Sequence, residues 1–471
     1  MKSKIRSFFR SITARNLAPE EIKLHHLVPP ILGESILRTT VGLINIAFLS
    51  RISDSMVSAV SISNQYIMLC QTIASAVATG TIVCINQAVG MKNTDGVGKM
   101  STIAVAANAV LGLLFGAFFV LLARPFLTIM SISERSMDIA VLYMQIVGGA
   151  MTVQCVEMVL SNICRSLGKT RVPLLLNLIM NLVNILGCWL VIYQPIPIPV
   201  SAVVGVAAIN VLSKVAGLIF AAMIVIRAKV QISLKFLKPF PWKEFKLALS
   251  IGIPGGANNL AYSSSQLVTT AIISRTGETM IAAKVYVTNL VHYVALIGMA
   301  CAQAAVILIG YRIGAGKYEE AMGLRARVTR IALISNIACS LLLAMVRIPL
   351  LRMFTQDEVI ISIASAIMLI DLFVEIGRAL NNTLSGALQA TGDVVFQLVV
   401  NQASGWLIAV GLAYVLGILC GWGLYGVWIA FALDEAARGL TLLFRWRSKK
   451  WLPKAMARRS IINGEAKTTS A

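Results

Sequence analysis

The sequence is short of charged residues, and of acidic ones most of all. Only 13% of the residues are charged, with 20 Asp and Glu against 41 Lys and Arg, while 58% are apolar and the mean hydropathy is +0.81. A chain of 471 residues does not need so large an apolar share to fill a water-soluble core. The composition therefore excludes a soluble protein and indicates an integral membrane protein.

Metal-binding and catalytic residues are also scarce. The three histidines, His25, His26 and His292, are too few and too dispersed to predict a metal site. The eight cysteines are scattered through apolar runs without paired spacing, which favours small buried residues over disulfides or metal ligands. No nucleophile, base and metal ligands converge in a pair of spans, so we expect no enzyme and no cofactor.

What the sequence does contain is apolar runs long enough to cross about 30 Å of hydrocarbon. Short Gly, Pro or charged connections separate these runs, which recur twelve times. The predicted spans are 27–49, 57–88, 101–123, 136–164, 174–193, 200–226, 248–273, 281–310, 328–350, 358–389, 397–419 and 423–444.

The basic residues lie on one side of this twelve-span zigzag. They gather before the first span, in 227–246, in 312–330 and in the tail that begins at Arg445. The positive-inside rule then predicts a multi-pass inner-membrane protein with both termini in the cytoplasm. The net charge of +21 is expected to meet anionic membrane lipid and not nucleic acid.

The chain also repeats itself at an offset of 224 residues. Pro30 falls on Pro254, Arg51 on Arg275 and Gly90 on Gly314, and without a gap the same shift takes Gly168 to Gly392 and Asn177 to Asn401. An ungapped register over roughly two hundred residues indicates a duplicated unit.

Each copy holds six spans, so both copies enter the membrane from the same side and the repeat is parallel. We expect an all-α integral membrane protein with twelve transmembrane helices in two pseudo-symmetric six-helix bundles, acting as a monomer. The predicted segments are a cytoplasmic N-terminal segment 1–26, a six-helix lobe 27–226, a linker 227–247, a second lobe 248–445 and a basic tail 446–471.

Charged residues inside the spans are the best candidates for an ion site, because a charge at the bilayer centre costs about 2.5–3.5 kcal/mol or more. Glu34 and Arg38 are one turn apart in span 1 and can pair. Asp371, Glu375 and Arg378 share one face of span 10, where two carboxylates beside a guanidinium can hold a proton or a cation. The alternative for Glu375 and Arg378 is a salt bridge that only joins helices.

A second set of span residues is polar without being acidic, and lipid would not tolerate it. We expect these side chains to line a substrate cleft. The candidates are Arg38, Asn45, Asn177, Asn181, Asn184, Asn258, Tyr262, Asn381, Asn382 and Asn401.

Paired motifs of the two copies resemble those of the multidrug and toxin extrusion (MATE) transporters. These motifs are GTIVCINQAVGMKNTD and ILIGYRIGAGKYEEA, followed in each copy by the turns RSLGKTRVP and LQATGDVVF. The resemblance covers about residues 27–450. It implies export of small organic compounds, amphipathic and cationic in character, by antiport with H⁺ or Na⁺ and alternating access.

The chain departs from the family's usual acidic positions. Where relatives carry an acid in span 1, span 7 or late in span 5, this sequence has Asn45, Tyr262 and Gly187, and Arg378 stands where one branch has an Asp in span 10. If the family mechanism holds, Glu34, Asp371 or Glu375 has to take the ion.

Three other functions stay open. A lipid or lipid-linked saccharide flippase of the same architecture would use Arg38, Arg378 and Lys214 for an anionic head group. A membrane-embedded enzyme would need a converging catalytic group, and a receptor or scaffold would lack a water-accessible cavity.

Overall fold

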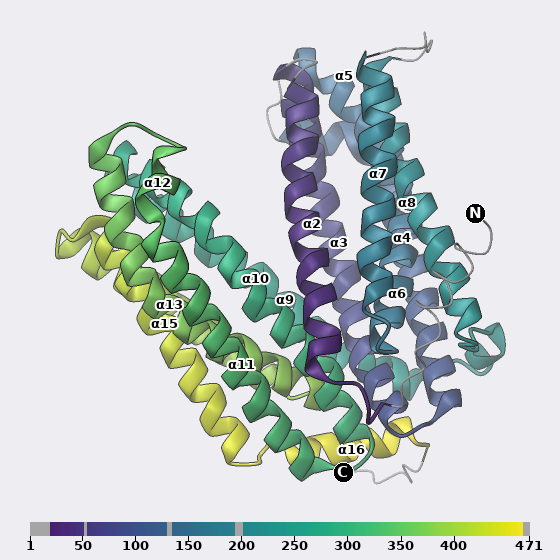
Figure 1. The fold of residues 1–471 in the computed structure, drawn as a ribbon. Helices are drawn as coiled ribbons and strands as arrows, with labels where there is room; N and C mark the ends of the chain where they lie inside the picture. The colour runs from purple at the N-terminus through teal and green to yellow at the C-terminus, as the bar shows by residue number, and fades with distance from the viewer. Residues whose placement is uncertain (1–18, 51–53, 130–133, 194–200, 465–471) are drawn as a thin grey trace, which may run out of the picture. The chain divides into compact units, whose positions relative to one another are not determined.

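The structure is a computed structural model, and it describes residues 19–50, 54–129, 134–193 and 201–464 (Figure 1). Within these ranges every regular element is a helix, and no strand occurs. The helices are α2 (Leu24–Ser50), α3 (Asp54–Gly90), α4 (Thr94–Ile129), α5 (Glu134–Tyr143), η1 (Met144–Gly148), α6 (Met151–Ser166), α7 (Arg171–Tyr193), α8 (Ala202–Arg227), η2 (Leu234–Leu237), α9 (Trp242–Ser274), α10 (Glu278–Gly314), α11 (Tyr318–Met345), α12 (Arg347–Arg352), α13 (Glu358–Thr391), α14 (Val394–Ser404), η3 (Gly405–Leu412), η4 (Val415–Leu419), α15 (Gly423–Arg447) and α16 (Leu452–Ile462).

The helix bounds reproduce the duplication. Helices α3 and α10 each have 37 residues, and both their starts and their ends differ by the predicted offset. The same offset relates the ends of α2 and α9 and the starts of α4 and α11. At the repeat-related turns, Gly168 and Gly392 have φ of 74° and 81°, a left-handed conformation that favours glycine. The prediction of two copies of one helical unit is therefore confirmed.

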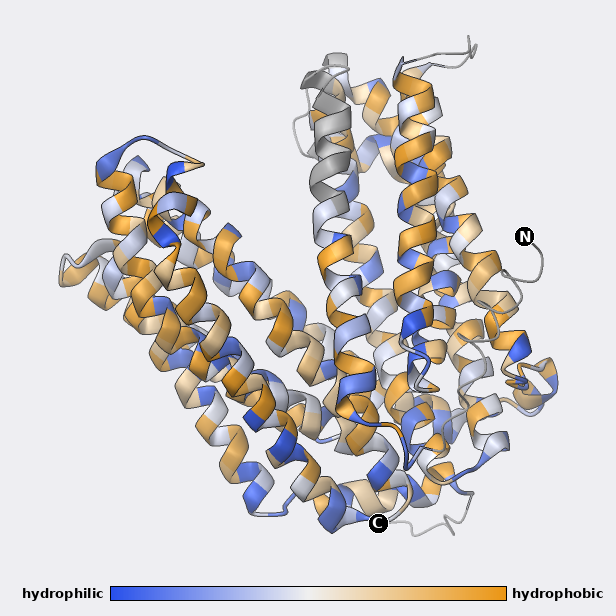
Figure 2. Cartoon of the chain, viewed as in Figure 1, coloured by the Kyte–Doolittle hydropathy of each residue, from blue (hydrophilic) through white to orange (hydrophobic). Residues whose placement is uncertain are grey.

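All twelve predicted spans fall on helical segments, but they are not equally apolar. Among the described residues, eight helices are long and apolar enough to cross a membrane, or up to nine if α5 and α6, bent by 45°, count as one span. The segments that do not qualify are α2, α9 and α15. Charged residues lower the hydropathy of α2, which holds Glu34 and Arg38, and of α15, which holds Asp434, Glu435 and Arg438. Hydrophobic residues cover most of α7 (Figure 2).

Contacts divide the chain into two compact units. Unit 1 is residues 1–22 and 33–252, and unit 2 is residues 23–32 and 253–471, so the start of α2 belongs to unit 2 and the start of α9 to unit 1. Within unit 1, α9 lies directly against α3: a Cβ on Gly80 would come within 1.9 Å of the Ala248 carbonyl oxygen, and one on Gly252 within 2.1 Å of that of Ala76. Only glycine permits this approach.

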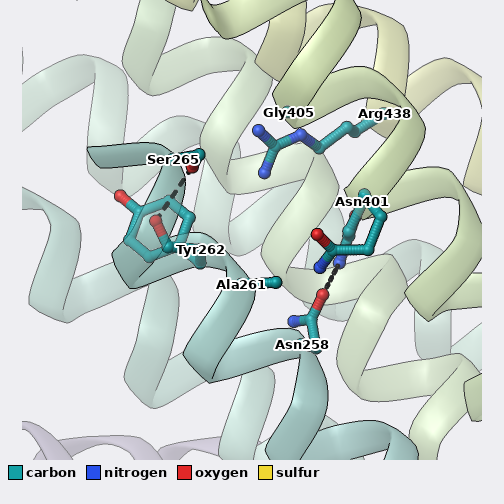
Figure 3. Close-up of a pocket in the computed structure, with 8 residues that line it drawn as sticks. Asn258, Ala261, Tyr262, Ser265, Asn401, Gly405 and Arg438 are labelled. Atoms are coloured by element: carbon teal, nitrogen blue, oxygen red, sulfur yellow. Dashed lines mark hydrogen bonds between the residues drawn. The ribbon is translucent and has the colours of Figure 1, made fainter. Parts of the chain in front are cut away.

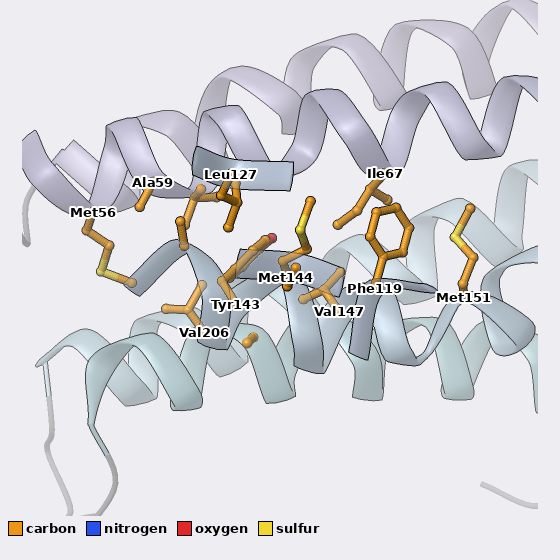
Figure 4. Packing of buried hydrophobic residues seen from close by; sticks show 14 of the residues in the cluster. Met56, Ala59, Ile67, Phe119, Leu127, Tyr143, Met144, Val147, Met151 and Val206 are labelled. Carbon is orange, nitrogen blue, oxygen red and sulfur yellow. The ribbon is translucent and has the colours of Figure 1, made fainter. Parts of the chain in front are cut away.

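The core of unit 1 lies between α3, α4, α5, η1, α6, α7 and α8. Phe119, Tyr143, Met144 and Met151 are fully buried there, and small residues such as Ala59 let the helices approach closely (Figure 4). Unit 2 has two such clusters. One is centred on Trp428, and the other joins Trp446 and Trp451 to the ends of α10 and α13.

Helix α16 closes one end of unit 2 through polar contacts. Arg459 donates to the carbonyl oxygen of Gly314 at 2.9 Å, and Arg458 to that of Thr391 at 3.3 Å, so both helix ends gain a donor. The buried Asp393 carboxylate accepts from Arg445 and Lys454, both at 2.7 Å. Burial alone would raise the pKa of Asp393, but these two basic partners outweigh it and lower that pKa.

Candidate transport site

The polar centre of unit 1 is the carboxylate of Glu34, which is only 4% exposed. Arg165, at the end of α6, donates to both carboxylate oxygens at 2.8 Å, and Asn177 of α7 donates at 3.3 Å. Arg38 donates across one helical turn at 3.3 Å. The predicted pairing of Glu34 with Arg38 is confirmed, but the bidentate contact to Arg165 is the better formed of the two.

Two more ionisable residues, Glu157 and Lys214, lie near this cluster. Glu157 of α6 is buried, and the positive charges of Lys214 and Arg38 act on it. The Arg38 side chain is 72% exposed, which makes it the least enclosed member. The cluster in unit 1 thus contains two acidic residues, Glu34 and Glu157, and three basic ones, Arg38, Arg165 and Lys214.

The other amides expected in this unit do not join Glu34. Asn184 is buried and has the Cys188 thiol 4.0 Å away. The Nδ2 of Asn181 is buried without a partner among the described residues. Asn45 lies in α2, but its side chain is outside the described residues.

In unit 2 the centre is Glu375 of α13, whose side chain is completely buried. One oxygen pairs with Arg378, and the other accepts from Asn336 of α11 at 2.9 Å. The salt bridge that the sequence predicted between Glu375 and Arg378 is confirmed. Asp371 is also buried, but its hydrogen-bond donor is the indole of Trp428, at 3.0 Å.

A third carboxylate, which we had not predicted as part of the site, completes this group. Glu435 of α15 lies 3.6 Å from Arg378 and accepts from Asn381 at 2.8 Å. Arg378 is therefore placed between a carboxylate of its own helix and one of α15. Its guanidinium therefore has a carboxylate to pair with on each of the two helices.

The residue before Glu435, Asp434, forms a separate pair that borders a pocket. Its carboxylate binds Arg438 one turn later and accepts from Ser404 at 2.5 Å. Arg438 then lines a small pocket of about 250 Å³, part of it open to solvent, with Asn258, Tyr262, Ser265 and Asn401 (Figure 3). Tyr262 accepts at its hydroxyl from Gln266 at 3.0 Å. Three predicted cleft residues, Asn258, Tyr262 and Asn401, thus meet at one pocket.

One hydrogen bond occurs in both units at repeat-related positions. Asn177 donates to Glu34 at 3.3 Å, and Asn401 donates to Asn258 at 3.0 Å, and both pairs are 143 residues apart in the chain. The two sites are copies of one local design that differ in charge.

The residues that the sequence missed make contacts across the fold. Arg165 lies 131 residues from Glu34, and Glu435 lies 57 residues after Arg378, so no local spacing links them. The sequence could still have indicated both residues, because ionisable residues in or next to an apolar run are rare. Among the described residues, no three His, Cys, Asp or Glu side chains are grouped as a metal would require.

Comparisons with known proteins agree with this architecture. The sequence model of the MatE family matches residues 30–190 and 254–415, one match in each copy of the repeat. The "Uncharacterized transporter YisQ" of Bacillus subtilis is 33% identical over 451 residues, 95% of this chain and 99% of that protein. The "Probable multidrug resistance protein NorM" of Thermotoga maritima is 26% identical over 97% of this chain and 98% of its own.

Solved structures have the same fold. One, described as the outward-facing conformation of a multidrug resistance MATE family transporter, has a TM-score of 0.81 with 18% identity, covering 97% of this chain and 99% of its own. Another is a transporter from Pyrococcus furiosus whose reverse polarity of binding pocket is said to suggest a different function. Its TM-score is 0.80 with 18% identity, and it covers 96% of this chain and 98% of its own.

Proposed function

The chain belongs to the MatE family of multidrug efflux transporters, and from this we propose that it exports organic cations in exchange for protons or sodium ions. The observation that carries this proposal is the buried acidic group of unit 2. Among the described residues there, two guanidiniums, those of Arg378 and Arg438, pair with this group of four buried carboxylates: Asp371, Glu375, Asp434 and Glu435. Such an excess of carboxylates inside a membrane-spanning unit favours a cationic ligand.

Glu375 is the group we propose for ion coupling. Its side chain is fully buried, and its two oxygens are bound by Asn336 and Arg378. Protonation of Glu375 would therefore weaken its contacts with both of these residues. An ion and a substrate can drive a transport cycle only if they bind its states with different affinity. Glu375 can provide this difference in affinity, because it would bind an ion more tightly in a state in which Arg378 pairs with Glu435 instead. Alternating access between inward and outward states is part of the proposal.

The unit 1 cluster has the opposite balance, which favours one second candidate. Arg38, Arg165 and Lys214 outnumber Glu34 and Glu157, and Arg38 is mostly exposed. A flippase for a lipid with an anionic head group would use such a cluster. We rank it second because Arg165 is already bound to Glu34 through both carboxylate oxygens.

The membrane and its orientation are also proposals. The basic segments around Arg312–Arg330 and Arg445–Lys454 place both termini in the cytoplasm if the positive-inside rule holds. We propose a monomer in the inner membrane whose only partners are its substrate, its ion and lipid. Reporter fusions at each terminus would check the orientation.

The deciding experiment uses inverted membrane vesicles and ethidium as the probe cation. We expect ethidium uptake to depend on an imposed pH or sodium gradient, and Glu375→Gln to abolish that dependence. Glu278→Gln, an exposed acid at the start of α10, serves as the matched control and should behave as wild type. Gradient-independent uptake in wild type, or unchanged coupling in Glu375→Gln, would refute the proposal. Movement of a fluorescent anionic lipid instead of ethidium would favour the flippase.

A further inference from the structure

The connection between α8 and α9 is docked on unit 1. Its short helix η2 lies against α4, and the backbone N–H of Ser233 donates to the hydroxyl oxygen of Thr102 at 3.2 Å. A Cβ on Gly98 of α4 would come within 2.7 Å of a backbone carbonyl oxygen of the connection, so this contact needs a glycine. At the start of α9, Glu244 pairs with Lys99 of α4. The connection is therefore a positioned segment and not a flexible tether.

The contacts on α4 place the connection at the edge of the membrane-spanning region. Gly98 and Thr102 follow the first residue of α4 by four and eight positions, or about 6 and 12 Å along the helix. The preceding helix α8 has 26 residues and a length of about 39 Å, so its end extends beyond about 30 Å of hydrocarbon. The connection that follows α8 therefore lies at the depth of the lipid head groups.

The exposed surface of the connection is both apolar and basic. Leu234 is 74% exposed and Trp242 is 61% exposed, and the rings of Phe240 and Trp242 meet edge-on with centroids 4.7 Å apart. Exposed lysines alternate with these side chains along the chain. We call this surface the connection patch and define it by Leu234, Lys235, Lys238, Phe240, Trp242 and Lys243. Aromatic residues interleaved with lysines are typical of segments that lie in a membrane interface.

The lysines of the connection patch have no acidic partner in unit 1. Among the residues that the structure describes, Lys235, Lys238 and Lys243 form no ion pair and donate no side-chain hydrogen bond. The nearby acid, Glu244, is already paired with Lys99. Three exposed cations at head-group depth are therefore left for an anion outside the described part of the protein.

The repeat-related segment of unit 2 uses its cations differently. The offset of 224 places η2 on residues 458–461, which lie in α16. There Arg458 and Arg459 donate to backbone carbonyl oxygens at helix ends, and Lys454 donates to the carboxylate of Asp393. The basic residues that follow the last span are thus bound by protein atoms in unit 2, whereas those of the connection patch are directed to another partner.

We propose that the connection patch binds anionic phospholipids, with its lysines on the phosphate groups and with Leu234 and Trp242 among the adjoining acyl chains. Each half of this contact has a driving force, because lysines are attracted to an anionic lipid surface and apolar side chains leave water. The depth of the patch favours lipid over a soluble acidic protein, since lipid phosphate is already present at that level. Such binding goes beyond the proposed transport activity, because it requires neither the substrate nor the coupling ion.

The test measures lipid binding to the full-length protein in detergent by native mass spectrometry. Phosphatidylglycerol is the probe, and phosphatidylcholine is the zwitterionic reference. We expect wild type to prefer phosphatidylglycerol. The triple variant Lys235→Gln, Lys238→Gln, Lys243→Gln should lower that affinity by about tenfold or more, because each lysine near an anionic surface contributes a factor of about five. Its affinity for phosphatidylcholine should not change.

The matched control removes three charges from lysines that already have acidic partners. It is Lys92→Gln, Lys317→Gln, Lys449→Gln, whose partners are Glu20, Glu320 and Glu319. This variant has the same net charge as the first and should keep the wild-type affinity for phosphatidylglycerol. An equal loss in both triple variants would show a general effect of net charge and would overturn the proposal.

A glycine variant tests whether the docked position of the patch matters. Gly98→Ala crowds the connection without changing any charge, so we expect it to weaken phosphatidylglycerol binding. An unchanged affinity would show that the lysines act as diffuse charge, and would refute a docked patch. Glu375→Gln should bind the lipid as wild type does, so this result is independent of transport.

The remaining arms separate lipid from other partners. In nanodiscs, phosphatidylglycerol brominated near the head-group end of its acyl chains should quench the fluorescence that is lost in Trp242→Phe. Inorganic phosphate should not displace the lipid in detergent. Displacement by inorganic phosphate, or an unquenched Trp242, would assign the patch to a soluble anion. A dimer that appears in wild type and not in the Lys235 triple variant would assign it to a second copy of the chain. Either result would overturn lipid binding.

Discussion

The two units place the same hydrogen bond in the same position but surround it with different charges. In unit 1, Asn177 donates to the carboxylate of Glu34, which Arg165 neutralises. In unit 2, Asn401 donates to the amide of Asn258, and the carboxylates have moved to α13 and α15. The duplicated fold thus requires a polar pair at this position and does not require a charge. The charge at this position therefore differs between the two copies, while the hydrogen bond is the same.

The largest effect should come from removing the cation that neutralises Glu34. Arg165→Ala leaves a buried carboxylate with only the exposed Arg38, so we expect a loss of about 3–5 kcal/mol of unfolding free energy in detergent. Gln389→Ala, at the repeat-related position of unit 2, should cost less than about 1 kcal/mol. Combining Arg165→Gln with Glu34→Gln should recover most of the loss. Equal losses at Arg165 and Gln389 would contradict the comparison.

Next in size is the transfer of the charge from one unit to the other. Asn258→Glu puts a carboxylate in a pocket whose arginine, Arg438, is already paired with Asp434, and should cost about 2.5–3.5 kcal/mol. Adding Gln389→Arg recreates the pair found in unit 1, so the double variant should be clearly more stable than Asn258→Glu. Thermal unfolding in detergent measures both. A double variant no more stable than the single would show that the two sites are not equivalent in geometry.

A smaller effect is expected at the turn after span 10, where Asp393 is repeat-related to Lys169. Asp393→Asn should cost about 1.5–3 kcal/mol at neutral pH, because it weakens hydrogen bonds from Arg445 and Lys454. The pKa of Asp393 is lowered in the folded protein, so its contribution is present above the ordinary pKa of an aspartate and is lost as the pH falls through the lowered value.

The difference in melting temperature between wild type and Asp393→Asn should therefore shrink on acidification. Lys169→Met is the control in unit 1. Burial lowers the pKa of Lys169, which means that the folded protein disfavours its charge. Removing that charge should leave the stability unchanged or raise it. If the difference in melting temperature between wild type and Asp393→Asn stays constant down to strongly acidic pH, the ion pairs of Asp393 do not contribute as predicted.

The smallest effect is predicted at the pocket of unit 2. Tyr262 is 46% exposed, and its hydroxyl accepts a hydrogen bond from Gln266 of the same helix. We therefore expect Tyr262→Phe to change the stability by less than about 0.5 kcal/mol. Ethidium uptake in vesicles would show whether the hydroxyl contacts a substrate. A large loss of stability would mean that the pocket is a structural element of unit 2.

The sequence predicted what depends on periodicity and proximity along the chain. Hydropathy located the twelve spans, the offset located the repeat, and spacing within a turn found the pairs Glu34–Arg38 and Glu375–Arg378. It could not find Arg165 beside Glu34 or Glu435 beside Arg378, because those contacts depend on how helices pack. Asp371 shows the same limit: its face was right, but its partner is Trp428, far along the chain.

The assignment of residues 23–32 to unit 2 and 242–252 to unit 1 has a practical consequence for handling the gene. A break in the connection near residues 230–240 would yield two polypeptides, each carrying a helical segment that packs in the other's unit. Expressed separately, the first would leave the glycine surface around Gly80 uncovered. Produced together, the two fragments would complement each other, so a split transporter should assemble only when both genes are present.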